Sequence, residues 1–441
     1  MQKRLRACAA AALASVVLAT SVVSAALQSA ASISKTDAAA ALSATDEILK
    51  VVSRLRGLEI KQAVKSGLKT KDEIEQAVIR DLDESTSPEE FDAMQKTFAK
   101  LGLTKKDFRL REYMVALMRE QVAGFYEPKT GEFYLAAWLP ISDQKRVIAH
   151  ELVHALQDQH FDLRRFEKWP KGDSDAELAA HALVEGEATL VMIQYDLDQQ
   201  GIRLDLTKLP SLANTMLDQD TDSDAKNYPV LASAPKVLRE NLQFPYIYGA
   251  GFVQSVLKSG SWQTLNNGYT NLPASSEQII HPEKFLTRDN PVKIEMADLL
   301  PALGKSWKQA DADVNGEFGY QVLLAEFIPK QSARTAAAGW GGDRYALYEN
   351  KETSALIVAQ YTTWDTANDA REFFDAYANR TEKRYGAARA KDSTAQLRVY
   401  ETGEGLVSIE MRGSDVVIIE GAQDREQLQR LSAQLWQSKK K

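Results

Sequence analysis

Hydrophobic positions recur at helical spacing through residues 36–120, so the first part of the chain is predicted to be helical. The clearest stripe consists of Ile48, Val51, Val52, Leu55 and Leu58. Further along, Ser87 is followed by Pro88 and two glutamates. A capping serine, a proline at the first helical position and an acidic first turn are typical of a helix N-terminus, so we expect a helix to begin there.

The pattern then changes to two short, aromatic-rich runs, residues 122–127 and 132–136, which flank the segment Pro128-Lys129-Thr130-Gly131. Two strand-like runs around a turn that contains proline and glycine predict a β-hairpin. Two helices are expected after it, one capped by residues 140–143 and a longer one over about 176–198.

A further helix is expected to start at Pro245 and to extend through Val256, because proline is favoured at a helix start. From about residue 296 the chain alternates between strand-like and helical segments. The predicted strands are 321–328, 345–348, 355–361, 396–401, 406–412 and 415–419, and the predicted helices are 364–385 and 424–437.

These elements predict an α+β protein. We expect a mainly helical domain with a small β-hairpin or sheet over residues 36–299, and a separate α+β accessory domain over residues 300–441. The chain of 441 residues is long enough for two domains.

The composition is that of a globular protein, with 44% hydrophobic and 26% charged residues. The formal net charge of −7 argues against a general nucleic-acid binder, which usually displays a basic face. No cluster of basic residues interleaved with aromatic residues is found, so no nucleic-acid partner is expected.

The N-terminus has the order of features of a secretory signal peptide. Lys3, Arg4 and Arg6 precede an apolar run over residues 7–19, and small residues follow at 23–26. We predict a signal peptide over residues 1–25 and a periplasmic or secreted bacterial protein, with no membrane span left after cleavage. The alternative is a single membrane anchor, which the weakly hydrophobic, alanine-rich run favours less.

The only cysteine, Cys8, lies inside this leader, ahead of most of the apolar run. A lipid-attachment cysteine would follow that run, so a lipoprotein is not expected. Cleavage would leave a mature chain without disulfides or thiol chemistry.

The candidate chemistry lies in His150-Glu151-Leu152-Val153-His154, an HExxH motif on a predicted helix. Positions i and i+4 lie one turn apart on one helix face, so both histidines can bind one zinc ion. Glu151 then stands beside the open coordination position, where its carboxylate can take a proton from zinc-bound water. A catalytic zinc site normally has a third protein ligand.

One candidate for that ligand is His160, because the segment from His150 to His160 almost matches the pattern HExxHxxGxxH. That pattern requires a glycine where this chain has Gln157, since the chain must turn sharply to bring the last histidine back. If the helix continues instead, His160 points away from His154.

The other candidates are Glu185 and Glu187, on the second long helix about thirty residues after the motif. A carboxylate from a helix that packs on the first would complete a His₂Glu site. The two glutamates cannot share one helix face, and Gly186 between them permits a close helix approach. A glutamate is favoured over His160 because of the missing glycine.

Glu185-Gly186-x-Ala188 resembles the glutamate motif of gluzincin metallopeptidases, and this resemblance implies Glu185 as the third zinc ligand. The chain from about Ala123 to Lys284 is also similar to a family of uncharacterised bacterial secreted HExxH proteins. The shared strings are Gly-Phe-Tyr-x-Pro before the motif, Leu-Val-Glu-Gly-Glu-Ala after it, Phe244-Pro245-Tyr246 with Gly249, and Glu277-Gln278 with His281-Pro282. The resemblance implies a zinc-dependent catalytic unit and no particular substrate.

A peptidase of this kind also needs a donor for the oxyanion of the tetrahedral intermediate, which tyrosine or histidine usually supplies. Tyr246 is favoured because it matches the family string, and His281 is an alternative. Asp158, four residues after His154, could orient that imidazole or could be a plain surface residue.

The function that these observations favour is a zinc-dependent exported peptidase, with polypeptide as its substrate. An edge strand of the hairpin just before the motif could pair with an extended peptide. The alternative is a non-catalytic, zinc-containing envelope binding or assembly protein. Retention of Glu151, which a structural zinc site would not need, favours the enzyme.

Overall fold

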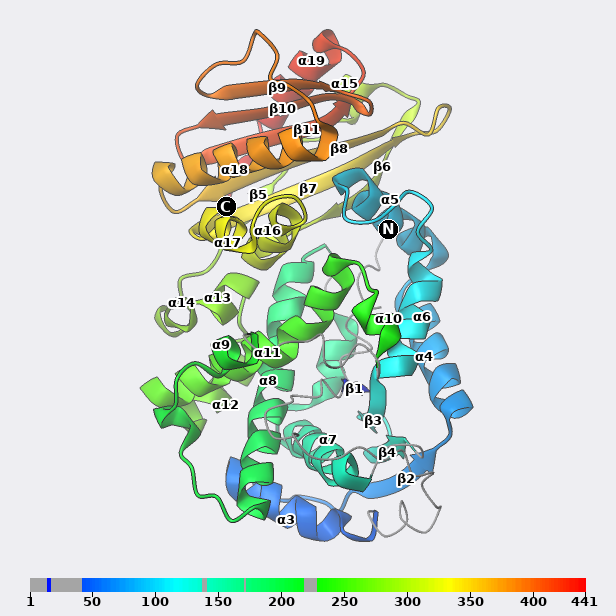
Figure 1. The fold of residues 1–441 in the computed structure, drawn as a ribbon, viewed down its shortest axis with the longest axis vertical. Coiled ribbons are helices and arrows are strands. Elements are labelled where there is room, and N and C mark those ends of the chain that lie inside the picture. The colour runs from blue at the N-terminus through cyan, green and yellow to red at the C-terminus, as the bar shows by residue number, and fades with distance from the viewer. Residues whose placement is uncertain (1–13, 17–41, 137–140, 170–171, 218–227) are drawn as a thin grey trace.

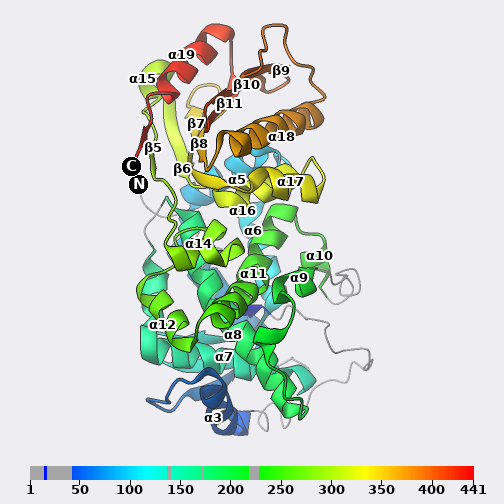
Figure 2. The same cartoon turned by 90° about the vertical axis from the view of Figure 1, so that its left-hand side faces the viewer.

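The computed structural model describes residues 14–16, 42–136, 141–169, 172–217 and 228–441, and its fold is α+β, as predicted (Figure 1). The predicted signal peptide lies outside the described residues except for a short strand, β1 (Ala14–Val16). The C-terminal part of the chain forms a six-stranded sheet. In two perpendicular views, this sheet and its own helices sit at one end of a larger helical region (Figures 1 and 2).

The N-terminal helices form where their caps and apolar stripes predict them. They are α3 (Thr45–Arg56), α4 (Lys71–Ser85), α5 (Pro88–Leu101) and α6 (Leu110–Gln121). Ser87 and Glu90 form a reciprocal capping box at the start of α5, which confirms the predicted helix start at Pro88. Within this helical stretch the structure adds a strand that was not predicted, β2 (Lys65–Lys69).

The predicted hairpin is confirmed as β3 (Val122–Glu127) and β4 (Glu132–Ala136). It lies in the middle of a four-stranded sheet with the order β1-β3-β4-β2, in which β2 runs parallel to β4. Because the partners in a parallel pair are far apart in the sequence, no local pattern identifies β2 as a strand.

Three long helices form the centre of the molecule: α7 (Ile141–Phe161), α8 (Ser174–Gln199) and α11 (Lys236–Ser259). Asp173 caps α8 by accepting a hydrogen bond from the backbone N–H of Ala176. The predicted start of α11 is wrong, since Pro245 lies inside the helix rather than at its first position. An internal proline removes one backbone hydrogen bond from the helix, and the surrounding packing compensates for that loss.

Shorter helices connect these long ones and continue to the sheet. They are η3 (Leu163–Lys168), η4 (Leu206–Lys208), α9 (Leu212–Leu217), α10 (Pro229–Ala232), α12 (Trp262–Thr270), α13 (Ser276–Ile280) and α14 (Pro282–Thr287). In the part of the chain that the structure describes, no helix has the length and apolar character that crossing a bilayer requires.

The C-terminal sheet is antiparallel, with the order β6-β7-β8-β11-β10-β9. Its strands are β6 (Trp307–Asp313), β7 (Trp340–Asn350), β8 (Leu356–Trp364), β9 (Leu397–Thr402), β10 (Gly405–Arg412) and β11 (Asp415–Ala422). Its helices are α15 (Leu300–Leu303), α16 (Gly316–Ala325), α17 (Lys330–Ala337), α18 (Ala367–Tyr385) and α19 (Arg425–Leu435). Two further short strands, β5 (Ile294–Glu295) and β12 (Lys439–Lys440), pair with each other.

Five of the six predicted C-terminal strands and both predicted helices are confirmed, whereas residues 321–328 are not a strand. They form the second half of α16 and the turn after it. The run Val322-Leu323-Leu324 is continuously apolar, and periodicity alone does not separate a buried strand from a buried helix in so short a run.

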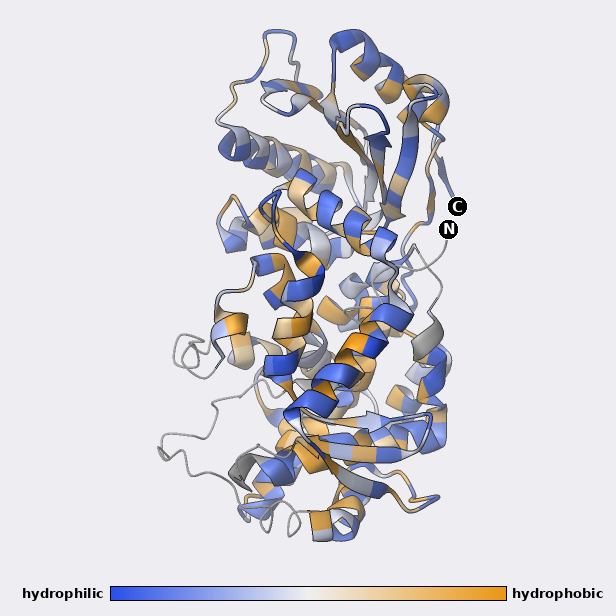
Figure 3. Ribbon diagram, turned by 90° about the vertical axis from the view of Figure 1, so that its right-hand side faces the viewer, coloured by the Kyte–Doolittle hydropathy of each residue, from blue (hydrophilic) through white to orange (hydrophobic). Residues whose placement is uncertain are grey.

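The two faces of the C-terminal sheet belong to different cores. One face, which includes Val358 and Ile418, shares a single hydrophobic core with the long helices α8 and α11. The other face, which includes Ile357 and Ile419, packs with α15 and α19. Hydrophobic and hydrophilic segments alternate along the outer helices, as expected for helices that bury one face (Figure 3).

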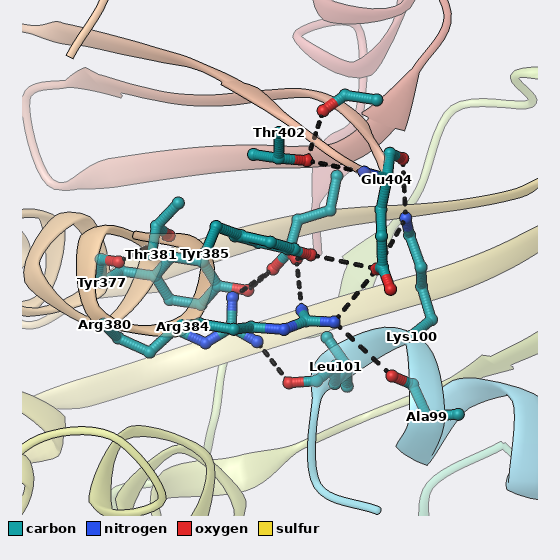
Figure 4. A network of polar contacts seen from close by, with 12 residues as sticks. Ala99, Lys100, Leu101, Tyr377, Arg380, Thr381, Arg384, Tyr385, Thr402 and Glu404 are labelled. Carbon is teal, nitrogen blue, oxygen red and sulfur yellow. Dashed lines mark hydrogen bonds and ion pairs between the residues drawn. The ribbon is translucent and has the colours of Figure 1, made fainter. Parts of the chain in front are cut away.

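A buried ionic network joins α5 to the C-terminal sheet. Arg380 on α18 donates to the carbonyl of Leu101 at the end of α5 (Figure 4). It also pairs with Glu420 of β11 at 2.7 Å. Arg384 pairs with both Glu420 and Glu404. Because the side chains of Arg380 and Glu420 are fully buried, this network fixes α5 to α18 and the sheet, although 279 residues separate Leu101 from Arg380 in sequence.

Candidate metal centre

The HExxH motif lies in the middle of α7, in the buried core between β3, β4 and α8. His150 is 3% exposed, and Glu151 and His154 are 0% exposed. The two histidine Nε2 atoms stand 3.1 Å apart, as the i and i+4 spacing on one helix face predicts.

Glu185 on α8 completes a triangle of potential metal ligands. Its Oε2 lies 3.1 Å from Nε2 of His150 and 3.4 Å from Nε2 of His154. Four tetrahedral ligands at the usual distances from zinc stand about 3.3 Å from one another, so these atoms have the spacing of three corners of such a site. The geometry and the donor set both fit zinc, and His150, His154 and Glu185 are the residues that would hold it.

A close helix contact holds α8, the helix that carries Glu185, against α11. On Gly186 of α8, a Cβ would stand 2.1 Å from the backbone carbonyl carbon of Gly249 on α11. Both positions therefore require glycine for α8 and α11 to approach as they do. A close helix approach at Gly186 was expected, and the structure shows one, but its partner is α11 and not the motif helix α7.

The charges within this group depend strongly on one another. Burial opposes ionisation of Glu185, but the charge on His154 and hydrogen bonds from both histidines lower its pKa to about 2. Burial likewise opposes protonation of His154, yet the Glu185 carboxylate raises the pKa of His154 to about 9. Burial lowers the pKa of His150. Without a metal, Glu185 is therefore a carboxylate and the two histidines share one added proton. A bound metal cation would replace that proton.

Gln157, where the HExxHxxGxxH pattern needs glycine, orients His154. Its Oε1 stands 2.8 Å from Nδ1 of His154, and its Nε2 donates to the carbonyl of Val184 and to the hydroxyl of Tyr269. Because both amide hydrogens are used in this way, Oε1 is left to accept a hydrogen from Nδ1 of His154. That arrangement leaves Nε2 of His154 as the nitrogen available to a metal.

Glu187 is the distant end of the same chain of hydrogen bonds. It accepts a hydrogen bond from the hydroxyl of Tyr269 at 2.8 Å and binds Arg56 of α3 through both carboxylate oxygens, at 2.6 and 3.2 Å. The side chains of Arg56 and Glu187 are 0% exposed. The structure therefore separates the two acidic candidates: Glu185 faces the histidines, and Glu187 stabilises Tyr269 and Gln157 from the other side of α8.

Two further side chains border the group. The ring of Tyr246 on α11 packs against His150, with 6.2 Å between ring centroids. His181, one turn before Glu185 on α8, is 4% exposed, and its Nε2 has no hydrogen-bond partner among the described residues. Burial lowers the pKa of His181 to about 4, so its imidazole is neutral at neutral pH.

The remaining candidates lie elsewhere. The helix continues past Gln157 to Phe161, and Nε2 of His160 bonds to the carbonyl of Glu59. Asp158 accepts hydrogen bonds from Tyr126 and from the backbone of Leu163. The residue that orients His154 is therefore Gln157 and not Asp158. His281 pairs with Glu317 in the corner between α13 and α14.

Sequence reasoning missed Gln157 as an orienting group, as well as Arg56, Tyr269 and His181. The i and i+3 spacing of His154 and Gln157 on one helix was the only local signal. Arg56 and Tyr269 reach Glu187 across 131 and 82 residues of sequence, which no local pattern shows.

A family model described as a domain of unknown function (DUF8575) matches residues 304–432, which form most of the C-terminal sheet and its helices. No curated protein matches the chain. No solved structure matches it either.

Proposed function

We propose that this chain is an exported zinc-dependent peptidase with a gluzincin-like site, in which His150, His154 and Glu185 hold the metal. The observation that carries the proposal is the buried triangle of their ligand atoms, with Glu151 next to His150 on the same helix. With three protein ligands, a bound zinc would keep room for a water molecule or a substrate oxygen, as catalytic zinc sites do.

Bound there, zinc would polarise the scissile carbonyl and lower the pKa of a water molecule at the open position. Glu151 acts as the general base, which accepts the proton of the attacking water and passes it to the leaving amine. The burial of Glu151 keeps bulk water from its carboxylate. Its charge also contributes to the raised pKa of His154, so the carboxylate lies within electrostatic reach of the metal ligands.

Tyr246 is the group that we assign to the oxyanion of the tetrahedral intermediate. Its ring packs on His150, and it is held beside the site by the contact between Gly186 and Gly249, one turn further along α11. A phenol hydroxyl near the reacting carbonyl would donate a hydrogen bond to the developing negative charge.

A polypeptide is the substrate class that the neighbouring sheet favours. In the structure, β3 pairs with β4 on one side and with β1 of the leader on the other. Cleavage of the leader after residue 25 would remove β1 and leave β3 as an edge strand, which an extended peptide can join by backbone hydrogen bonds.

One observation favours the alternative of a non-catalytic, zinc-containing envelope protein: the three ligands are almost completely buried. Structural zinc sites are, however, usually closed by four ligands and rich in cysteine. Among the described residues the group offers three ligands, and none of them is a cysteine.

The experiment compares the wild-type chain with Glu151→Gln on a peptide library, with metal content measured by elemental analysis. We expect equal zinc content and a loss of cleavage of roughly a hundredfold or more in Glu151→Gln. Glu89→Gln, an exposed glutamate on α5, is the matched control and should cleave like the wild type. Equal cleavage by wild type and Glu151→Gln, or zinc binding without any cleavage by the wild type, would refute the peptidase.

A further inference from the structure

A cavity of about 130 Å³ lies between α8, α11, the end of α5 and α16. Most of its wall is apolar, including Leu101, Leu242, Phe318 and Val322. Of these, Leu101, Phe318 and Val322 are buried in the large core that the helical region shares with the C-terminal sheet. The cavity is thus part of the junction between the two regions of the molecule.

The cavity adjoins the candidate metal centre through two side chains. Tyr246 lines it, and the same ring packs against His150. His181 also lines it and stands one helical turn before Glu185 on α8. A group that occupies the cavity therefore lies beside the reacting centre of the proposed peptidase.

Part of the cavity wall comes from the C-terminal region. Phe318, Gly319, Val322 and Leu323 of α16 line the cavity, together with Tyr345 of β7. All of them fall within residues 304–432, the part that matches the domain of unknown function. In Figure 1, α16 lies at the junction between the sheet and the helical region.

The size and chemistry of the cavity select one kind of occupant. An apolar cavity of about 150 Å³ binds benzene, so a volume of this order suits one leucine, methionine or phenylalanine side chain. Among the described residues that line the cavity, none is a lysine or arginine, whereas Asp175 and Glu177 are acidic, so an acidic side chain is disfavoured as its occupant. The unpartnered Nε2 of His181 offers one buried hydrogen-bonding group to the backbone of whatever enters.

We infer that this cavity binds a large apolar side chain of the polypeptide substrate next to the cleaved bond, and that α16 of the C-terminal region sets its depth. The inference rests on the proposed peptidase for the nature of the substrate. It gives the domain of unknown function a role in specificity.

The test uses the full chain and one readout that needs no turnover. Ligand-observed NMR measures the dissociation constant of N-acetyl-L-leucinamide for the wild type, Val322→Phe and Val399→Ala. Val322→Phe fills the cavity and should weaken binding at least tenfold. Val399→Ala is the control and should leave binding unchanged. Val399 is also buried, but it packs in the core on the other face of the sheet.

The second readout is the cleavage pattern on a peptide library. We expect the wild type and Val399→Ala to prefer a large apolar residue at one position beside the cleaved bond, and Val322→Ala to shift that preference toward phenylalanine and tryptophan. Val322→Ala is less disruptive than Val322→Phe and keeps the test valid if the latter does not fold.

The two readouts separate the two hypotheses. Two outcomes would overturn the assigned pocket while the peptidase stands. One is the same cleavage preference in wild type and Val322→Ala, and the other is equal probe binding by wild type and a folded Val322→Phe. If Val322→Phe abolishes probe binding but the wild type cleaves no peptide, the pocket stands and the peptidase is overturned. The polypeptide is then overturned as the occupant as well.

Discussion

Gly186 on α8 and Gly249 on α11 are in backbone contact: a Cβ on Gly249 would stand 2.2 Å from the carbonyl oxygen of Ala182 and 2.9 Å from Cα of Gly186. This contact holds the helix that carries Glu185 against the helix that carries Tyr246. The arrangement of the candidate site therefore depends on two residues that have no side chain.

We expect Gly186→Ala and Gly249→Ala to destabilise the protein by about 1–3 kcal/mol, because the two helices must move apart. In a helix free of such contacts the same change would stabilise by up to about 1 kcal/mol. Gly268→Ala on α12 is the control, since its Cβ would meet its nearest neighbour at an ordinary 3.4 Å. Urea unfolding followed by circular dichroism measures the difference, and a stabilising effect at Gly186 would contradict the close contact.

The third ligand is tested by comparing Glu185→Ala with His160→Ala. We expect Glu185→Ala to lose its zinc, because two imidazoles alone hold the ion weakly. His160→Ala should keep a full complement of zinc, since His160 bonds to the backbone at Glu59 instead. Zinc content after dialysis against a weak chelator is the measurement. The reverse result would restore His160 as the ligand.

Gln157→Leu should weaken zinc binding by roughly 10–100-fold, because His154 loses the acceptor that places its proton on Nδ1. Gln159→Leu makes the same change two residues further along α7, where the side chain bonds to the loop at Lys61 and Gln62, and should leave the affinity unchanged. Competition with a chromogenic chelator gives both affinities. Equal affinities would show that Gln157 has only a packing role.

The buried Glu420 predicts a pH dependence of stability. Burial opposes its ionisation, but Arg380 and Arg384 outweigh burial and lower the pKa of Glu420 to about 2. A depressed pKa in the folded state stabilises the protein above the ordinary value of 4.5, and this stabilisation is lost as the pH falls toward 2. The contribution is on the order of 3 kcal/mol.

Glu420→Gln should lower the free energy of unfolding at pH 7 by about 3–5 kcal/mol, since it leaves Arg380 buried without its anion and Arg384 with Glu404 alone. Its stability should also fall less than that of the wild type between pH 5 and pH 3. Glu401→Gln removes an exposed partner of Arg425 and should change stability by less than about 1 kcal/mol. Parallel acid limbs in wild type and Glu420→Gln would contradict the lowered pKa.

Much of the fold could be predicted from local patterns. The capping box at Ser87, the hairpin around the turn before Gly131 and the cap at Asp173 all involve residues within a few positions of one another. The errors arose where the outcome depended on distant partners. Residues 65–69 form a strand because β4 lies beside them, and α11 continues through Pro245 because its packing holds it in helical form.

The sequence by itself determined that His150 and His154 share a helix face with Glu151 beside them, because helical geometry is a local property. It also limited the third ligand, since Gln157 in place of glycine argued against a turn toward His160. The resemblance to the gluzincin motif already implied Glu185, but helical geometry alone left both glutamates open. Only the tertiary structure brings Glu185 to the histidines and connects His154 through Gln157 to Tyr269 and Glu187. These choices depend on how α7, α8 and α11 pack and on Arg56, and contacts between distant segments form only when the whole chain folds.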